Sequence, residues 1–201
     1  MNIIDFLVQV DVKLFLTLNG WRSSFFDFLM YWISDKYIWV PFYAFVLYLI
    51  ARVYKIQTFY ILGFIVLLIT LSDQSSVHLF KNVFERLRPC HNPHLEGMVN
   101  LINNRCGGQF GFISSHASNS YALASFVFFL LRRHYFKFAV WMLVWAAIVG
   151  YSRIYLGVHY PADVFAGSIV GFLWGWLVYA LFSWFSLKVC KNKNVTDIQS
   201  S

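Results

Sequence analysis

Long apolar runs separated by short polar breaks dominate this sequence. A helix needs about 20 mainly apolar residues to cross the hydrocarbon core of a bilayer. We assign five such spans, at 37–54, 58–80, 117–131, 136–151 and 161–187. A shorter run, 25–33, raises the count to six if it crosses as part of a broken helix or a re-entrant element. The pattern therefore predicts an all-α fold, a polytopic membrane helix bundle with five to six transmembrane helices.

The first 20 residues show a different pattern. Apolar residues recur with helical spacing at Ile3, Phe6, Leu7, Val10, Leu14 and Leu18. Charged residues such as Asp5, Asp11 and Lys13 are interleaved with them, which is typical of an amphipathic helix lying in the membrane surface. We expect Asn19 and Gly20 to end this helix. Residues 1–35 are therefore interpreted as an interfacial N-terminal segment of a single membrane domain that comprises residues 1–201.

The composition supports a membrane protein, because 59% of the residues are hydrophobic and only 12% are charged. The net charge of +7 could suggest a nucleic-acid partner, but the basic residues are scattered between apolar runs. In a membrane protein such residues mark cytoplasmic loops or bind anionic head groups. We expect the lipid bilayer and no nucleic acid as partner. The first residues show no signal-peptide pattern.

Five spans place the two ends of the chain on opposite sides of the membrane. Lys and Arg divide evenly between the sides, but those on one side lie in short loops and in the tail 188–201. The positive-inside rule then predicts a cytoplasmic tail and an exterior segment 81–114, as in a bacterial inner membrane with the site facing the periplasm. Cys90 and Cys106 lie in that exterior segment, where they could form a disulfide; two free thiols are the alternative.

Three polar stretches fall on this exterior side. The first contains Lys81 and Arg88, whose spacing of seven residues predicts one face of a helix leaving the membrane. The second is Ser114, Ser115 and His116 at the start of a predicted helix; either serine can be its N-cap, and a helix N-terminus offers free N–H groups to an anion.

The third stretch contains Arg153, His159 and Asp163. Pro161 favours the start of a helix. Asp163 then falls in the first turn, where a carboxylate is favourable and can reach back four residues to His159. A carboxylate on one ring nitrogen raises the basicity of the other, which makes a histidine a competent base or nucleophile.

Together these stretches favour phosphoryl-transfer chemistry. Three cations and a helix N-terminus suit a transition state that spreads charge over three oxygens. One histidine can attack phosphorus while the other protonates the leaving oxygen. The sequence shows neither an acidic cluster nor the His spacing of a zinc site. The prediction is metal-free transfer through a phosphohistidine, with no cofactor.

In these three stretches the chain resembles the type 2 phosphatidic acid phosphatase superfamily, whose signature is KxxxxxxRP, PSGH and SRxxxxxHxxxD. The first part matches at Lys81, Arg88 and Pro89, and the third at Ser152, Arg153, His159 and Asp163. The middle part matches at Ser114 and His116, whereas Ile113 replaces proline and Ser115 replaces glycine. The change to Ser115 puts the closest backbone approach to the phosphate in doubt, although its hydroxyl can serve as a donor.

The resemblance implies a role for each matching residue. It makes His159 the nucleophile, Asp163 its orienting partner and His116 the general acid. It assigns the phosphate to Lys81, Arg88, Ser114 and Arg153, with Ser115 as a substitute donor and Ser152 as a helper.

The resemblance implies an integral membrane phosphatase that removes the terminal phosphate of a lipid phosphate or diphosphate. Candidate substrates are undecaprenyl diphosphate, phosphatidylglycerophosphate and the phosphates of lipid A. The alternative is a non-catalytic protein that binds or transports lipid phosphates on the same scaffold. A vanadate-dependent haloperoxidase uses a similar constellation, but those proteins are soluble, which the apolar spans argue against. The sequence leaves the oligomeric state open.

Charged and titratable residues that are not signature positions receive structural interpretations. Asp73 lies inside a predicted span, where an ionisable group can be functional; we favour a bond to a neighbouring helix. Arg86 and Glu85 are interpreted as a solvated helix face. His91 and His94 are interpreted as solvated loop residues, with substrate recognition as the alternative.

Overall fold

The computed structural model describes residues 2–103 and 105–199, the residues from 189 on by their backbone alone. It contains α1 (Ile3–Gly20), α2 (Ser24–Ser34), α3 (Val40–Tyr54), α4 (Thr58–Ser75), α5 (Asn82–Phe84), α6 (Ser115–Leu131), α7 (Phe136–Tyr155) and α8 (Pro161–Gln199). No strand occurs in these two ranges, so the predicted all-α class is confirmed.

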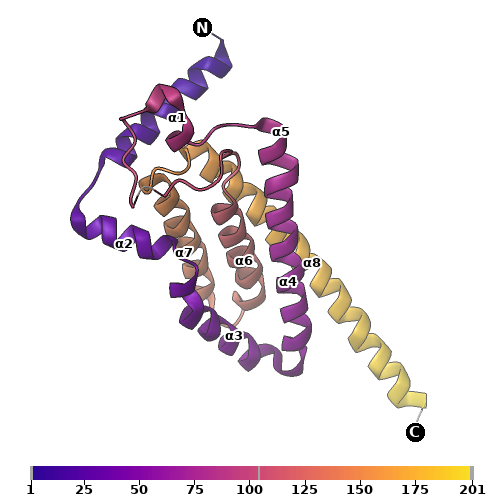
Figure 1. Ribbon diagram of the computed structural model, residues 1–201. Coiled ribbons are helices and arrows are strands. Elements are labelled where there is room, and N and C mark those ends of the chain that lie inside the picture. The colour runs from indigo at the N-terminus through magenta and orange to yellow at the C-terminus, as the bar shows by residue number, and fades with distance from the viewer. Residues whose placement is uncertain (1, 104, 200–201) are drawn as a thin grey trace.

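Among the described residues, three helical stretches are long and apolar enough to cross a membrane: Tyr37–Phe84, Phe136–Tyr155 and Pro161–Lys188. The first contains both α3 and α4, which form a hairpin with a turn at Lys55 (Figure 1). Helix α6 has 17 residues, and serines and an asparagine occupy its first turns. The number of five to six spans and the interfacial position of α1 stay predictions.

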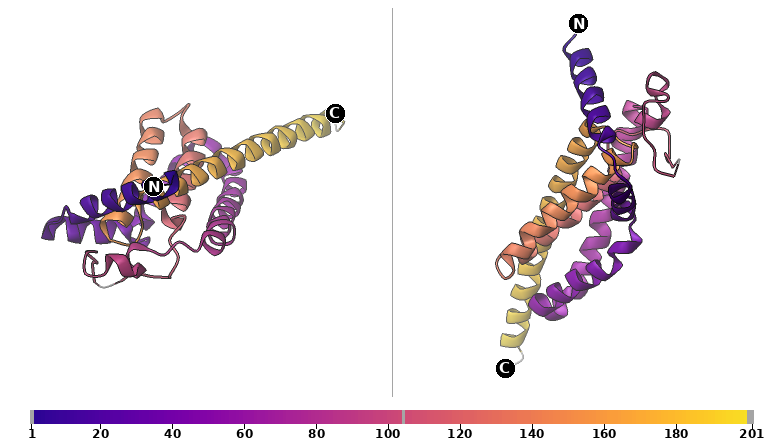
Figure 2. Two further views of the ribbon diagram at one scale, coloured as in Figure 1. Left: turned by 90° about the horizontal axis from the view of Figure 1, so that it is seen from above. Right: turned by 90° about the vertical axis from the view of Figure 1, so that its left-hand side faces the viewer.

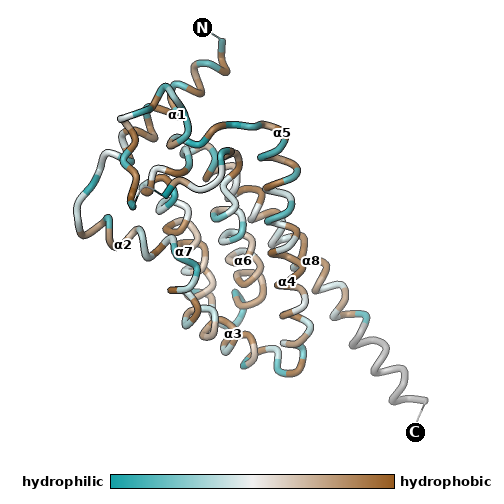
Figure 3. The backbone as a smooth tube through the Cα atoms, viewed as in Figure 1, coloured by the Kyte–Doolittle hydropathy of each residue, from teal (hydrophilic) through white to brown (hydrophobic). Residues whose placement is uncertain are grey.

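Helix α6 lies at the centre of the bundle and packs against α4, α7 and α8 (Figure 1). The outer faces of the bundle carry exposed large apolar side chains such as Phe59, Val66 and Phe165. The hydropathy colours show this apolar character along α4, α7 and α8, with polar residues gathered at the end where α1 and α5 lie (Figure 3). An apolar exterior of this extent fits a lipid environment.

A stripe of glycines on α8 brings its backbone against α6. Gly167, Gly171 and Gly175 recur every four residues and so share one face of the helix. A Cβ atom at Gly167 would lie 2.7 Å from the carbonyl oxygen of Ser114, and one at Gly171 would overlap the carbonyl of Ser118. Small residues at this spacing permit close helix contacts in membranes. This stripe was not predicted from the sequence, although its spacing is a recognisable signal.

The predicted helix carrying Lys81 and Arg88 on one face is wrong. Helix α4 passes into a π-helical segment, η3 (Ser76–Lys81), and the short α5 ends at Phe84. Glu85 then adopts a left-handed conformation, with φ of 46°. Arg88 is extended, as expected for a residue before proline, and Leu87 pairs with Phe110 in an isolated antiparallel bridge.

Helix α8 extends beyond the predicted end at residue 187 and continues to Gln199. The physical reason is that no Gly or Pro interrupts residues 176–199. Residues 200–201 of the predicted cytoplasmic tail, and the side chains from residue 189 on, lie outside the described part of the chain. The views in Figure 2 show α8 projecting well past the rest of the bundle.

Candidate active site

The structure brings the three predicted stretches together at one end of the bundle. Lys81 ends η3, His116 is the second residue of α6, and Asp163 lies in the first turn of α8. The backbone N–H of Ser114 donates to the carbonyl oxygen of Asp163 at 3.0 Å, which joins the starts of α6 and α8. Burial lowers the pKa of His116 to about 2, with a further contribution from the positive charges of Arg153, His159, Lys81 and Arg88.

His159 and Asp163 form a buried pair, with exposed fractions of 1% and 0%. Nδ1 of His159 lies 3.5 Å from Oδ2 of Asp163. This oxygen also accepts the backbone N–H of Tyr160 at 3.0 Å. The carboxylate is thus held against the ring, as the sequence spacing of four residues anticipated.

The surroundings of His159 favour a neutral imidazole. Burial lowers the pKa of His159 well below its ordinary value of 6.5. The positive charges of Arg88, Arg153 and Lys81 lower this pKa further. A neutral ring keeps a lone pair available for attack on an electrophile such as phosphorus.

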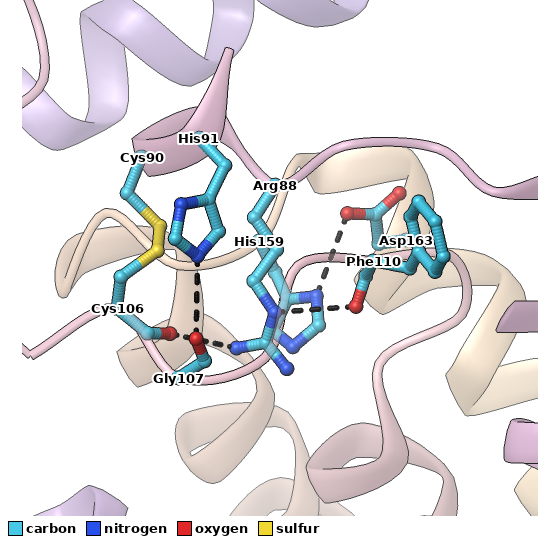
Figure 4. The surroundings of a disulfide bond; sticks show 8 residues. All are labelled: Arg88, Cys90, His91, Cys106, Gly107, Phe110, His159 and Asp163. Carbon is cyan, nitrogen blue, oxygen red and sulfur yellow. Dashed lines mark hydrogen bonds and ion pairs between the residues drawn. A yellow bond between two sulfur atoms is a disulfide. The ribbon is translucent and has the colours of Figure 1, made fainter.

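Arg88 is anchored to the loop that a disulfide closes (Figure 4). Its Nη1 donates to the carbonyl oxygen of Cys106 at 2.9 Å, and its Nε donates to that of Phe110 at 3.2 Å. Cys106 is disulfide-bonded to Cys90, two residues after Arg88, with the Cα atoms 6.0 Å apart. Figure 4 shows the guanidinium alongside the ring of His159. The disulfide therefore restrains both the backbone and the hydrogen-bond acceptors of Arg88.

One group of potential metal ligands lies close together within the described ranges, namely Cys90, His91 and Cys106. Its two sulfur atoms are bonded to each other, so neither is a thiolate ligand. The ring of His91 is hydrogen-bonded to the carbonyl oxygen of Gly107 at 3.2 Å.

Lys81 and His116 flank Ser115 at the start of α6. The Nζ of Lys81 donates to the Oγ of Ser115 at 2.7 Å, so the residue that replaces the signature glycine holds the lysine. Ser114 is the N-cap of α6, and its Oγ accepts the N–H of Ala117 at 3.4 Å. His116 is exposed to a cavity.

That cavity has a volume of about 730 Å³ and runs from Ser115 and His116 between α3, α4, α6 and α7. Its far part is lined by apolar residues such as Ile50 and Leu62. Asp73 lies on its wall and accepts a hydrogen bond from the amide of Asn119 on α6 at 3.2 Å. This bond agrees with the structural role expected for Asp73.

The two remaining predicted residues lie near the end of α7. Arg153 donates from Nη1 to the hydroxyl of Ser34 in α2, and its buried Nε has no partner among the described residues. The hydroxyl of Ser152 is buried and donates to the carbonyl oxygen of Val149 at 2.7 Å. Ser152 is therefore bonded to its own helix, whereas Arg153 keeps donor capacity for an anion.

The interpretation of Arg86 as part of a solvated helix face is wrong. The helix ends before this residue, and its Nη1 donates to Oδ1 of Asp163 at 2.8 Å. Its Nη2 donates to Oδ2 of Asp11 at 2.6 Å. The sequence contains little indication of this, because the side chain of Arg86 points inward only as a result of the backbone conformation after α5.

A helical bundle with these histidines and cations gathered at one end defines a membrane phosphatase scaffold. Residues 58–186 match the PAP2 superfamily. Over 180 residues the chain is 40% identical to a lipid A 4′-phosphatase of Bacteroides thetaiotaomicron, covering 88% of this chain and 78% of that protein. A lipid A 4′-phosphatase of Porphyromonas gingivalis is 36% identical over 179 residues, which cover 89% of this chain and 75% of the relative.

Among solved structures, the transmembrane PAP2 type phosphatidylglycerolphosphate phosphatase of Bacillus subtilis has the same fold. The TM-score is 0.67 at 22% identity, with 87% of this chain and 85% of that chain covered. The chain belongs to the PAP2 superfamily of type 2 phosphatidic acid phosphatases. It is a lipid phosphatase.

Proposed function

We propose that this protein hydrolyses a terminal phosphate of lipid A, an acylated and phosphorylated sugar, without a metal ion and through a phosphohistidine. The observation that carries the proposal is the convergence of His159, Asp163 and His116 beside the cations of Lys81 and Arg88. The choice of lipid rests on the two relatives described as lipid A 4′-phosphatases.

In the first step the neutral ring of His159 attacks phosphorus, and the bond from phosphorus to the sugar oxygen breaks. His116 gives its proton to the departing oxygen, and the negative charge of the bound phosphate favours the protonated form of His116 beforehand. Asp163, whose Oδ2 lies 3.5 Å from Nδ1 of His159, orients the ring and stabilises the positive charge that develops on it.

In the second step water attacks the phosphohistidine. His116, now neutral, takes a proton from this water, the bond from nitrogen to phosphorus breaks, and inorganic phosphate leaves. Lys81, Arg88 and Arg153 neutralise the phosphoryl oxygens in both steps, together with the hydroxyls and N–H groups of Ser114 and Ser115 at the start of α6. No step requires an electron donor or a metal-bound water.

The cavity beside His116 can hold an acyl chain of the lipid substrate. Its apolar lining extends from the histidine between the helices, so an acyl chain can lie there while the phosphate reaches Lys81 and Arg88. The disulfide between Cys90 and Cys106 supports a site on the oxidising side of a bacterial inner membrane, facing the periplasm, with the tail of α8 cytoplasmic.

Phosphate release from a lipid panel tests this function. Protein purified in detergent should release phosphate from lipid A faster than from undecaprenyl diphosphate or phosphatidylglycerophosphate, and EDTA should leave the rate unchanged. A rate that depends on added Mg²⁺ would overturn the metal-free mechanism. Faster turnover of the polyprenyl lipid would overturn the choice of substrate and leave the phosphatase activity in place.

The low pKa of His159 makes a prediction about pH. A protonated ring has no lone pair, so the fall of kcat/KM toward low pH should lie at the pKa of His159, well below 6.5. No fall toward low pH should therefore appear near 6.5. A decrease of kcat/KM with rising pH reports instead the loss of the proton from His116, because burial and the nearby positive charges lower the pKa of His116 to about 2 in the free protein. Because a phosphate monoester itself titrates near a pKa of about 6, the profile needs two substrates of different phosphate pKa. A fall of kcat/KM toward low pH that is centred near 6.5 and is the same for both substrates would contradict a neutral, buried nucleophile.

A further inference from the structure

Helix α1 contacts the first turn of α8 through a buried carboxylate. Asp11 accepts the backbone N–H of Ala162 on its Oδ1 at 2.9 Å, and Ala162 lies in that turn. A free N–H at a helix start is an obligatory donor, and Asp11 satisfies it from another helix. The other oxygen, Oδ2, accepts Nη2 of Arg86 at 2.6 Å.

Arg86 connects Asp11 to Asp163. One end of its guanidinium binds Asp11 and the other donates to Oδ1 of Asp163 at 2.8 Å. The guanidinium also lies over the ring of Tyr160, 4.1 Å from its centroid. Its backbone carbonyl oxygen accepts the N–H of Gly111 at 2.8 Å, so the residue is held at both the backbone and the side chain.

The charges in this chain of contacts depend on one another. Asp163 is fully buried, and a buried carboxylate without a partner is strongly unfavourable. Arg86 supplies that partner, and it binds Oδ1, which leaves Oδ2 facing Nδ1 of His159. Asp11 in turn pairs with the guanidinium, so the three groups together carry one negative charge beside the imidazole.

Two further contacts fix α1 in this position. Asn19 is fully buried; its amide donates to the carbonyl oxygen of Tyr155 at 2.8 Å, and its Oδ1 accepts the N–H of Asn100 at 2.8 Å. Phe15 packs edge-to-face on Tyr160 with ring centroids 5.4 Å apart. Helix α1 therefore holds both elements that flank His159, namely the end of α7 and the start of α8.

We propose that Arg86 and Asp11 are positioning residues for the phosphoryl transfer, and that α1 is a part of the active site. Arg86 fixes the orientation of the Asp163 carboxylate toward His159, and Asp11 fixes Arg86. This inference rests on the proposed role of His159 as nucleophile. Helix α1 would then support catalysis in addition to its predicted contact with the membrane surface.

Charge-removing substitutions test this proposal through kcat and its pH dependence. Arg86→Gln and Asp11→Asn should each lower kcat about 10- to 100-fold, the range typical of residues that orient a reacting group. KM should change little, because neither residue is among those proposed to bind the phosphate. Asp5→Asn removes the same charge from an exposed position of α1 and should match the wild type.

The two substitutions should move the acid limb of kcat/KM in opposite directions. Loss of the Arg86 cation favours the protonated His159 and raises the apparent pKa, whereas loss of the Asp11 anion lowers it. The other charged and titratable groups around His159 are Asp163, Arg88, Arg153, Lys81 and His116, which both variants retain. A defect in folding alone would not shift this apparent pKa in a direction set by the sign of the removed charge.

The outcomes separate this inference from the function it rests on. An inactive wild type on every lipid phosphate defeats the proposed function. An active wild type with an unshifted acid limb in Arg86→Gln, or with a change in KM alone, defeats only the inference. Inhibition by inorganic phosphate reports whether each variant is folded. If Arg86→Gln does not fold, Asp11→Asn decides alone: a lower kcat that Asp11→Glu restores supports the proposal, and an unchanged kcat overturns it.

Discussion

Replacing His159 with asparagine should reduce the turnover of lipid phosphates by about 10⁴-fold or more, because loss of a covalent nucleophile removes the reaction path and leaves only binding effects. Asparagine keeps a polar side chain of similar size in a site that is 1% exposed, so the fold should survive. Labelled phosphate should remain with the wild-type protein after a rapid denaturing quench at high pH, where a phosphohistidine persists. The variant should retain no label.

The matched control is His94→Asn, because His94 is exposed in the loop after the first signature stretch. It should label and turn over like the wild type. Label retained by His159→Asn would place the phosphoryl group on another residue and reject His159 as the nucleophile.

Replacing His116 with asparagine should have an effect that depends on the leaving group. With lipid A the departing sugar oxygen is a strong base, so loss of the general acid should slow its release by about 10²- to 10⁴-fold. An aryl phosphate carries a good leaving group that needs no proton. The first step on this substrate should therefore be nearly unaffected by the substitution.

The second step still needs His116 to activate water, so the variant should accumulate phosphoenzyme with the aryl phosphate. The measurement is a burst of phenol followed by slow turnover, together with more protein-bound label than in the wild type. Equal losses on both substrates and no burst would show that His116 does not act as the acid and base of this reaction.

The sequence predicted the helices well because their apolar runs are long and are separated by clear polar breaks. The helix at 58–80 and the one beginning at Pro161 needed no tertiary information beyond this pattern. The pairing of His159 with Asp163 was also predictable, since both lie on a short local stretch whose geometry proline and the first helical turn define.

Features that depend on contacts between distant segments were not predictable. The seven-residue spacing of Lys81 and Arg88 fits two helical turns, yet the chain leaves the helix between them to pair Leu87 with Phe110. Arg86 looked like a surface residue because its partners, Asp11 and Asp163, are 75 and 77 residues away in sequence. No local pattern encodes such a pairing.

The backbone contact between α6 and α8 has a mechanical consequence. His116 lies in the first turn of α6 and His159 lies two residues before α8, so the close contact of these two backbones sets the spacing of the segments that carry the two rings. A bilayer that thickens, thins or curves would tilt these helices as one rigid unit. The spacing of the segments that carry His116 and His159 should thus be insensitive to membrane tension.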